Sequence, residues 1–151
     1  MKHFVLERNK EMHTKIVSNE QELQDAYYVR KTVFVEEQNV PVEEEIDEHE
    51  GSATHFVLYE GANPIGAGRF RVLDGIGKVE RICVLMDYRG TGAGNVVMNA
   101  IEQHAKGLGL SSLKLNAQTQ AIPFYSKLGY EVVSEEFLDA GIPHKTMKKI
   151  V

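Results

Sequence analysis

Apolar and polar positions repeat along the chain with periods that change from segment to segment, and these periods predict its strands and helices. The run at 12–18 predicts a first strand. The segment 19–38 repeats its apolar residues near the 3.6-residue period, which predicts a helix. Ser18 and Gln21 have the spacing of a capping box that would start this helix, and a second short helix is expected around 43–50.

Three strand-like runs follow, at 53–61, 63–73 and 77–86, and glycine-containing turns separate them. Turns this short favour antiparallel pairing of neighbouring strands. The first half of the chain therefore predicts a helix followed by an antiparallel meander.

The second half predicts a different arrangement: a helix at 92–106, a strand at 111–117, a short helix at 121–129, and strands at 130–138 and 143–151. The strand before the long helix and the strand after it should be parallel, joined by a right-handed crossover. The expected fold class is mixed α/β.

Composition is typical of a single soluble domain, and we expect one domain over residues 1–151. No apolar run approaches the roughly 20 residues that a membrane-spanning helix needs, and the N-terminal stretch lacks the apolar core of a signal peptide. Cys83 is the only cysteine, so no internal disulfide can form. These features favour a cytoplasmic protein.

The net charge of −5 argues against a nucleic-acid partner, and no membrane partner is expected. Part of the acidity is concentrated in the run at 35–50. Two interpretations stay open: a solvated loop or helix face, or an electrostatic attraction for a cationic substrate.

Three glycines, Gly90, Gly92 and Gly94, come just before the long helix. Free backbone amides at a helix N-terminus attract anions, and Arg89 can add a charge-assisted bond to phosphate. A Walker A loop is excluded, because Asn95 stands where that motif needs lysine, and the upstream hairpins are the wrong context for a dinucleotide fold. A tight strand-to-helix turn without a ligand is the alternative.

The flanks of this loop carry a family resemblance. Residues 80–102 resemble the coenzyme A motif of the GNAT superfamily of N-acetyltransferases, with Arg89, Gly92 and Gly94 at the signature positions. Residues 115–133 are similar to the second signature of that superfamily, with matches at Ala121, Phe124, Tyr125, Gly129 and Tyr130. The segments "VRKTVFVEEQNVP", "NAQ" and "GIPH" resemble a bacterial YjcF-like and ElaA-like branch. Met86 stands where many members of the superfamily have proline, and Gln118 stands where many have asparagine.

This resemblance implies a GNAT-like fold: a mostly antiparallel sheet of six to seven strands with one parallel pair, and about four helices. It implies acetyl-CoA as co-substrate and an acetyl group transferred directly to a primary amine. The amine could belong to a small molecule, a peptide N-terminus or a lysine side chain. The strand at 82–84 would separate from its neighbour and pair with pantetheine, and the amides of 89–95 would hold the pyrophosphate. The implied coenzyme A contacts are Ile82, Cys83, Val84, Arg89, Gly90, Thr91, Gly92, Ala93, Gly94, Asn95, Asn116, Gln118, Phe124 and Tyr125.

Tyr125 occupies the position where the family often has a general acid for the departing thiolate. A phenol is protonated at neutral pH and can donate. The alternative is an aromatic residue packed under the helix, with its hydroxyl bonded to the backbone.

Glu80 is the candidate general base. Strand alternation puts it on one face with Ile82 and Val84, where apolar neighbours would raise its pKa. A salt bridge to Arg69 or Arg71 on the adjacent strand is the alternative. Cys83 is expected to be a core residue rather than a nucleophile, because direct transfer needs no covalent intermediate.

The candidate acceptor contacts are Arg30, Glu37, Gln38, His55 and His144. Charge pairing on a helix surface is the alternative for the first three, and a structural cap of the "GIP" turn is the alternative for His144, which could also serve as a base. No metal site is expected. Two other functions stay open, a non-catalytic acyl-CoA-binding or sensing module and a nucleotide-phosphate binder, and a homodimer is compatible with the resemblance.

Overall fold

A central eight-stranded sheet organises the computed structural model, which describes residues 12–151. Our expectation for the N-terminal stretch therefore falls largely outside the described residues. The strands are β1 (Met12–Ile16), β2 (Thr54–Glu60), β3 (Asn63–Leu73), β4 (Ile76–Val84), β5 (Ser112–Gln118), β6 (Glu131–Val132), β7 (Phe137–Asp139) and β8 (Ile142–Ile150). The α-helices in this range are α2 (Glu20–Arg30), α3 (Val42–Glu45), α4 (Ala93–Gly107) and α5 (Ile122–Lys127). A π-helix η1 (Lys31–Glu37) extends α2, and single 3₁₀ turns are η2 (Glu50–Ser52), η3 (Met86–Tyr88) and η4 (Thr119–Ala121).

The strand order is β1-β2-β3-β4-β5-β8-β6, with β7 also paired to β8. Only β4 and β5 are parallel, and every other pair is antiparallel. This confirms the mixed α/β fold class with one parallel pair. The sheet has more strands than expected because the run at 130–138 is interrupted by the polar segment 134–136, and so forms two short strands instead of one.

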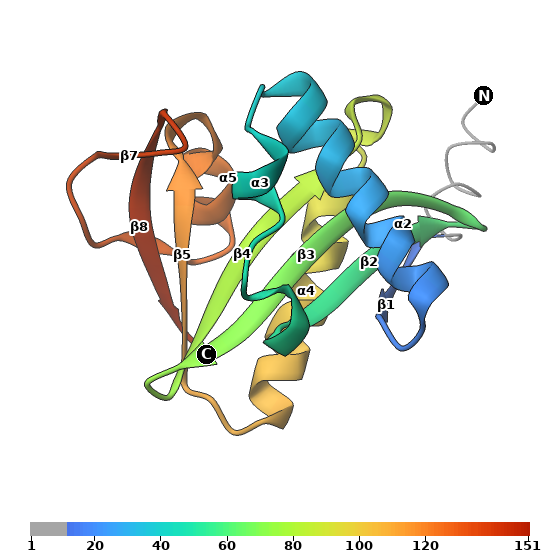
Figure 1. Ribbon diagram of the computed structural model, residues 1–151. Helices are drawn as coiled ribbons and strands as arrows, with labels where there is room; N and C mark the ends of the chain where they lie inside the picture. The colour runs from blue at the N-terminus through green and yellow to red at the C-terminus, as the bar shows by residue number, and fades with distance from the viewer. Residues whose placement is uncertain (1–11) are drawn as a thin grey trace.

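Helices cover both faces of the sheet: α2 lies in front and α4 behind in Figure 1. Val97, Ile101 and Ala105 of α4 pack into the larger core, which includes Phe56 and Leu58 of β2. On the other face, α2 and η1 contribute to a smaller core. Within the described residues no helix is long and apolar enough to span a bilayer.

The start of α2 differs by one residue from the predicted capping box. Asn19 is the N-cap, and its side chain accepts a hydrogen bond from the Glu22 amide at 2.8 Å. The Glu22 carboxylate in turn accepts from the Ser18 amide at 2.8 Å. The capping residues are therefore Asn19 and Glu22, and the prediction that Ser18 and Gln21 form the capping box is wrong.

A β-bulge in β4 sets which side chains face the site. Ala67 pairs with Cys83 and Arg69 with Glu80, so two residues of β4 lie opposite Gly68 alone. Arg81 takes a positive φ of 58° at this bulge. A Cβ on Gly68 would lie 2.8 Å from the Ile82 side chain, so only glycine lets Ile82 turn inward.

The bulge reverses the alternation on which the Glu80 prediction relied. Ile82 and Val84 pack against the core on the α4 side, whereas Cys83 belongs to the core on the α2 side. Glu80 contacts Arg69, whose other partners lie in the segment that covers the α2 side. The prediction that Glu80 shares a face with Ile82 and Val84 is therefore wrong, because an extra residue lies between them.

Strands β4 and β5 are paired over one short stretch only, Gly77–Val79 with Leu113–Leu115. Beyond it they diverge, as Figure 1 shows, and α3 lies in front of the opening. Among the described residues, the remaining length of β4 therefore has no strand partner on its β5 side. This is the splayed edge that the family resemblance implied.

Candidate active site

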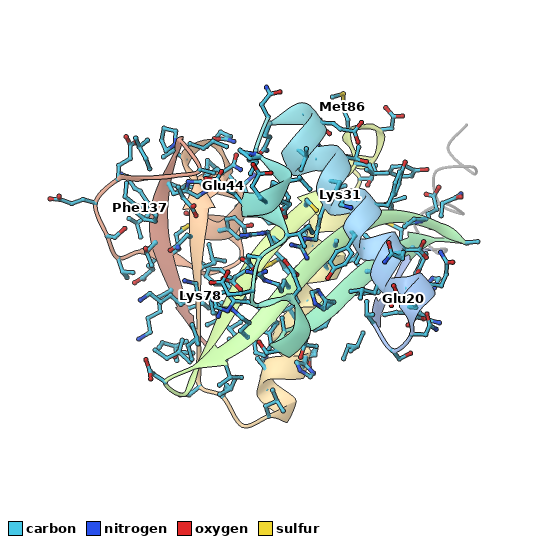
Figure 2. All side chains as sticks on the ribbon, viewed as in Figure 1. Glu20, Lys31, Glu44, Lys78, Met86 and Phe137 are labelled. Carbon is cyan, nitrogen blue, oxygen red and sulfur yellow. The ribbon has the colours of Figure 1, made fainter. Side chains whose placement is uncertain are left out.

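A cleft of about 960 Å³ occupies the opening between β4 and β5. Figure 2 shows Glu44 on α3 and Lys78 on β4 at this part of the molecule, with Phe137 on the side of β7. Most of the predicted site residues line it: Gln38, Glu80, Ile82, Cys83, Val84, Arg89, Gly90, Gly92, Ala93, Gly94, Asn95, Asn116, Gln118, Phe124, Tyr125 and His144. Four predicted residues are not in its lining: Arg30, Glu37, His55 and Thr91.

The glycine loop forms one end of the cleft. Within residues 12–151, the amides of Gly90 to Asn95 donate to no protein acceptor, whereas the Arg89 amide donates to the Met86 carbonyl at 3.2 Å. Gly92 caps α4 with a φ of 89°, a conformation that glycine adopts without strain. A Cβ on Gly94 would lie 3.0 Å from the ring of Phe124. The loop therefore offers free donors at a helix N-terminus, where an anion is favoured.

The Arg89 guanidinium has a protein partner beside this loop. It donates to both oxygens of Glu37 at 2.9 Å and to the Val84 carbonyl at 3.0 Å. Glu37 thus lies at the glycine-loop end of the cleft rather than at the acceptor side. The pair is partly exposed, so an anion in the loop can compete with Glu37 for the arginine.

Tyr125 lies in the wall of the cleft and is 8% exposed. Its hydroxyl has no hydrogen-bond partner among the described residues, so the backbone bond that we considered as an alternative is absent from that range. Burial, and next the neighbouring Cys83, raise the pKa of Tyr125, which keeps the phenol protonated. Burial likewise raises the pKa of Cys83, which keeps its thiol neutral and a poor nucleophile.

Glu80 is held by two arginines. Arg71 donates to both of its carboxylate oxygens at 2.7 and 3.0 Å, and Arg69 donates at 3.1 Å. Burial acts to raise the pKa of Glu80, but the Arg71 hydrogen bond and both guanidinium charges outweigh it, so the pKa is lowered. The expected raised pKa is wrong, because the bulge turns Glu80 toward the arginines of β3.

A network of buried ion pairs continues from Glu80 into the acidic run. Arg30 and Arg69 are each 1% exposed. Arg30 bonds Glu45 and Glu50, and Arg69 bonds Asp47 and Glu50. These pairs anchor Glu45, Asp47 and Glu50 to α2 and β3. Glu43, Glu44 and Glu48 of the same run are exposed, so only part of the acidic run is a solvated face.

The predicted residue His55 lies beside this network, and Arg81, which the sequence did not indicate as a site residue, belongs to it. The Glu50 carbonyl lies 2.8 Å from His55 Nε2, which holds His55 under the segment and outside the cleft. Arg81 at the bulge bonds the Glu45 and Asp47 carboxylates. Arg81 therefore ties the splayed strand to the opposite wall of the cleft.

Three carboxylates in the cleft lining have no ion pair within residues 12–151: Glu43, Glu44 and Asp139. Sequence reasoning flagged the acidic run as a whole but did not single out Glu43 or Glu44, and it missed Asp139 entirely. The signal for Asp139 was the Ala140-Gly141 pair, which predicts a two-residue hairpin loop.

One amide pair bridges the cleft. Gln118 Nε2 donates to Gln38 Oε1 at 2.8 Å, which joins the end of β5 to the residue after η1. Asn116 accepts from the hydroxyl of Thr146, its partner on the adjacent strand β8, at 2.9 Å. Gln38, Asn116 and Gln118 all line the cleft, and their predicted contacts with ligands stay predictions.

Comparison with known proteins tests the family. A model of the acetyltransferase (GNAT) domain matches residues 8–151. The chain belongs to the GNAT acetyltransferase family. YjcF of Bacillus subtilis, named an uncharacterized N-acetyltransferase, is 58% identical over 139 residues, which are 91% of this chain and 99% of YjcF.

Solved GNAT structures resemble this one along the chain. An acyl-CoA N-acyltransferase from Pseudomonas aeruginosa has a TM-score of 0.80 and 26% identity, covering 91% of this chain and 97% of its own. ElaA of Escherichia coli has a TM-score of 0.79 and 24% identity, covering 92% and 98%, and this likeness concerns the fold. The predicted resemblance to YjcF is confirmed by sequence identity, and the resemblance to ElaA is confirmed at the level of the fold.

Proposed function

We propose that this GNAT protein transfers an acetyl group from acetyl-CoA directly to a primary amine. The observation that carries the proposal is the splayed β4–β5 opening, which has free amides at one end and a buried, protonated tyrosine in its wall. GNAT proteins use acyl-CoA as co-substrate, and this geometry suits one. We treat residues 1–151 as one such domain.

Coenzyme A would lie along the cleft. The amides of 90–95 would hold the diphosphate, with Arg89 released from Glu37 to join them. The unpaired edge of β4 at 82–84 would hydrogen-bond pantetheine. Phe124 packs against Gly94 and would complete the wall.

The chemistry needs three protein groups. An amide of β4 near Ile82 to Val84 would donate to the thioester oxygen as it gains charge. The amine nitrogen bonds the acetyl carbon, the carbon–sulfur bond breaks, and Tyr125 protonates the departing thiolate. The amine must also lose a proton, and two side chains in the cleft lining, Glu80 and His144, are candidates to take it.

The charge of the cleft favours a cationic acceptor. Glu43, Glu44 and Asp139 line it without ion partners within the described range. Their field would concentrate an amine that carries a further positive charge. We therefore propose a small polyamine-like acceptor. We also propose the cytoplasm as the location, since Cys83 leaves no internal disulfide.

Thiol release from acetyl-CoA tests the activity. The acceptors compared would be spermidine, lysine amide and a monoacylated diamine, which carries only the one charged amine to be acetylated, with a control that lacks amine. We expect amine-dependent release that is strongest with spermidine. Tight coenzyme A binding without release above the control would support the non-catalytic module. Equal competition by adenosine nucleotides that lack pantetheine would support the nucleotide-phosphate binder.

A further inference from the structure

The β7–β8 hairpin brings His144 into the wall of the cleft. Ala140 and Gly141 form its two-residue loop with φ values of 52° and 76°, both in the left-handed region that the tightest hairpins use. Strand pairing then places His144 opposite Phe137 on β7 and opposite Gln118 on β5. Cross-strand partners share a face, so His144 lies beside the amide that bridges the cleft.

Local contacts fix the orientation of the His144 ring. Its Nδ1 lies 2.6 Å from the Ile142 carbonyl oxygen. A carbonyl only accepts, so Nδ1 carries the proton and donates. The ring also stacks on Phe137, with centroids 6.0 Å apart and planes at 23°. In the neutral tautomer that these contacts orient, the lone pair is on Nε2.

Nothing in the described part of the chain uses that lone pair. His144 is 8% exposed and lines the cleft, and Nε2 has no hydrogen-bond partner within residues 12–151. The other candidate base, Glu80, has both carboxylate oxygens bonded by Arg71 and a lowered pKa. A carboxylate held in that way is a weak proton acceptor.

We propose that Nε2 of His144 is the general base that takes the proton from the acceptor amine. The step balances: the amine nitrogen bonds the acetyl carbon, its proton passes to Nε2, the carbon–sulfur bond breaks, and Tyr125 protonates the thiolate. The Ile142 carbonyl stabilises the imidazolium that forms, because it accepts from Nδ1. This role rests on the proposed N-acetyltransferase function, and it displaces Glu80 as the base.

The test compares two acceptors in one set of variants. Spermidine is protonated at neutral pH and must lose protons, whereas hydroxylamine is already neutral and needs little help from a base. His144→Asn keeps an amide N–H near the place of Nδ1 but lacks Nε2. His49→Asn is the matched control, because His49 lies outside the cleft lining. Glu80→Gln tests the rival base.

We expect His144→Asn to lower kcat with spermidine by about 100-fold, in the range of lost general base catalysis. The KM, the Kd for coenzyme A and the rate with hydroxylamine should stay within about threefold. Imidazole added to His144→Gly should restore part of the spermidine rate. His49→Asn should match the wild type.

Several results would overturn the role of His144. A wild-type rate with His144→Asn would do so, and so would equal losses with both acceptors, because a structural defect does not distinguish them. If Glu80→Gln, and not His144→Asn, lost activity with spermidine but kept it with hydroxylamine, the base would be Glu80. If the wild type released no thiol with either acceptor, the proposed function itself would fail and the role of His144 with it.

Discussion

Tyr125 and Glu80 line the same cleft, but their surroundings change their pKa values in opposite directions. Burial raises the pKa of Tyr125, and the arginines of β3 lower that of Glu80 against the effect of burial. The sequence predicted a proton donor at Tyr125 from its motif. For Glu80 the sequence left two states open, a raised pKa among apolar neighbours and a salt bridge to Arg69 or Arg71, and the salt bridge is confirmed. The choice between them depends on the bulge at Arg81, because arginine rarely takes the positive φ found there.

Tyr125→Phe tests the proton donor. We expect kcat for thiol release to fall by about 10- to 100-fold, because the thiolate would leave without an acid. The melting temperature should barely change, since the hydroxyl bonds nothing in the described protein. Tyr28→Phe on the exposed face of α2 is the control. A Tyr125→Phe enzyme with a wild-type kcat would exclude this role.

The glycine loop and α4 are among the elements that the sequence predicted closely. The helix was expected at 92–106 and spans Ala93–Gly107. Glycine spacing and apolar period mark the same boundary here, so two independent signals agree. The form of the first helix was less predictable, because its second half, η1, is a π-helix, and the spacing of apolar residues does not indicate one.

Gly92→Ala tests the loop. A Cβ at a φ of 89° strains the backbone by roughly 1–2 kcal/mol, so we expect lower stability and weaker coenzyme A binding. Gly107→Ala is the matched change at the other end of α4, where a Cβ meets open space. It should raise the free energy of unfolding by roughly 0.4–1 kcal/mol and leave binding unchanged. Urea titration would measure the stability of each variant, and calorimetry would measure its coenzyme A binding. Equal effects of the two variants would contradict a role of the glycine loop in coenzyme A binding.

The acidic segment 42–52 is anchored by arginines from other elements. Either interpretation of its charge was open from the sequence, because the partners Arg30 and Arg69 lie far away along the chain. The structure divides the carboxylates of this segment into two groups: some are bonded by arginines, and others face the cleft. Long-range pairing of this kind has no local signature.

Asp47→Asn tests this anchoring through the pH dependence of stability. Burial acts to raise the pKa of Asp47, but the Arg69 hydrogen bond and further partners lower it from 3.8 to about 2. Its lowered folded-state pKa contributes stability that is present above the unfolded pKa of 3.8 and is lost as the pH falls toward about 2. In urea unfolding across this pH window, the free energy of unfolding should fall less steeply with decreasing pH for the variant than for the wild type. Equal slopes would mean that Asp47 is not held by Arg69 in solution.

Across the whole molecule, the sequence could predict the sheet and the glycine-loop end of the cleft, because both depend on contiguous motifs. The acceptor end could not be predicted in the same way. It combines Glu43 and Glu44, the bulge at Arg81, the end of β5 and the hairpin with His144. Only the folded sheet brings these segments together, and no period in the sequence relates them.

Salt dependence tests the charge of the acceptor end. Between about 0.01 and 0.15 M salt, the Debye length shortens from about 30 to about 8 Å. We expect kcat/KM for spermidine to fall severalfold over this range and that for hydroxylamine to stay constant. The double variant Glu43→Gln, Glu44→Gln should reduce the salt dependence. An identical response of both acceptors would contradict a cationic substrate.

Amide NMR during titration with coenzyme A tests the central claim most directly. The free donors of the glycine loop should bind the diphosphate, so the amide signals of Gly90, Gly92 and Gly94 should shift and saturate. Gly61 and Gly75 also have positive φ but lie in hairpin turns outside the cleft, and their signals should stay in place. Loop signals that do not move at saturating coenzyme A would contradict this binding mode and the acetyl transfer that depends on it.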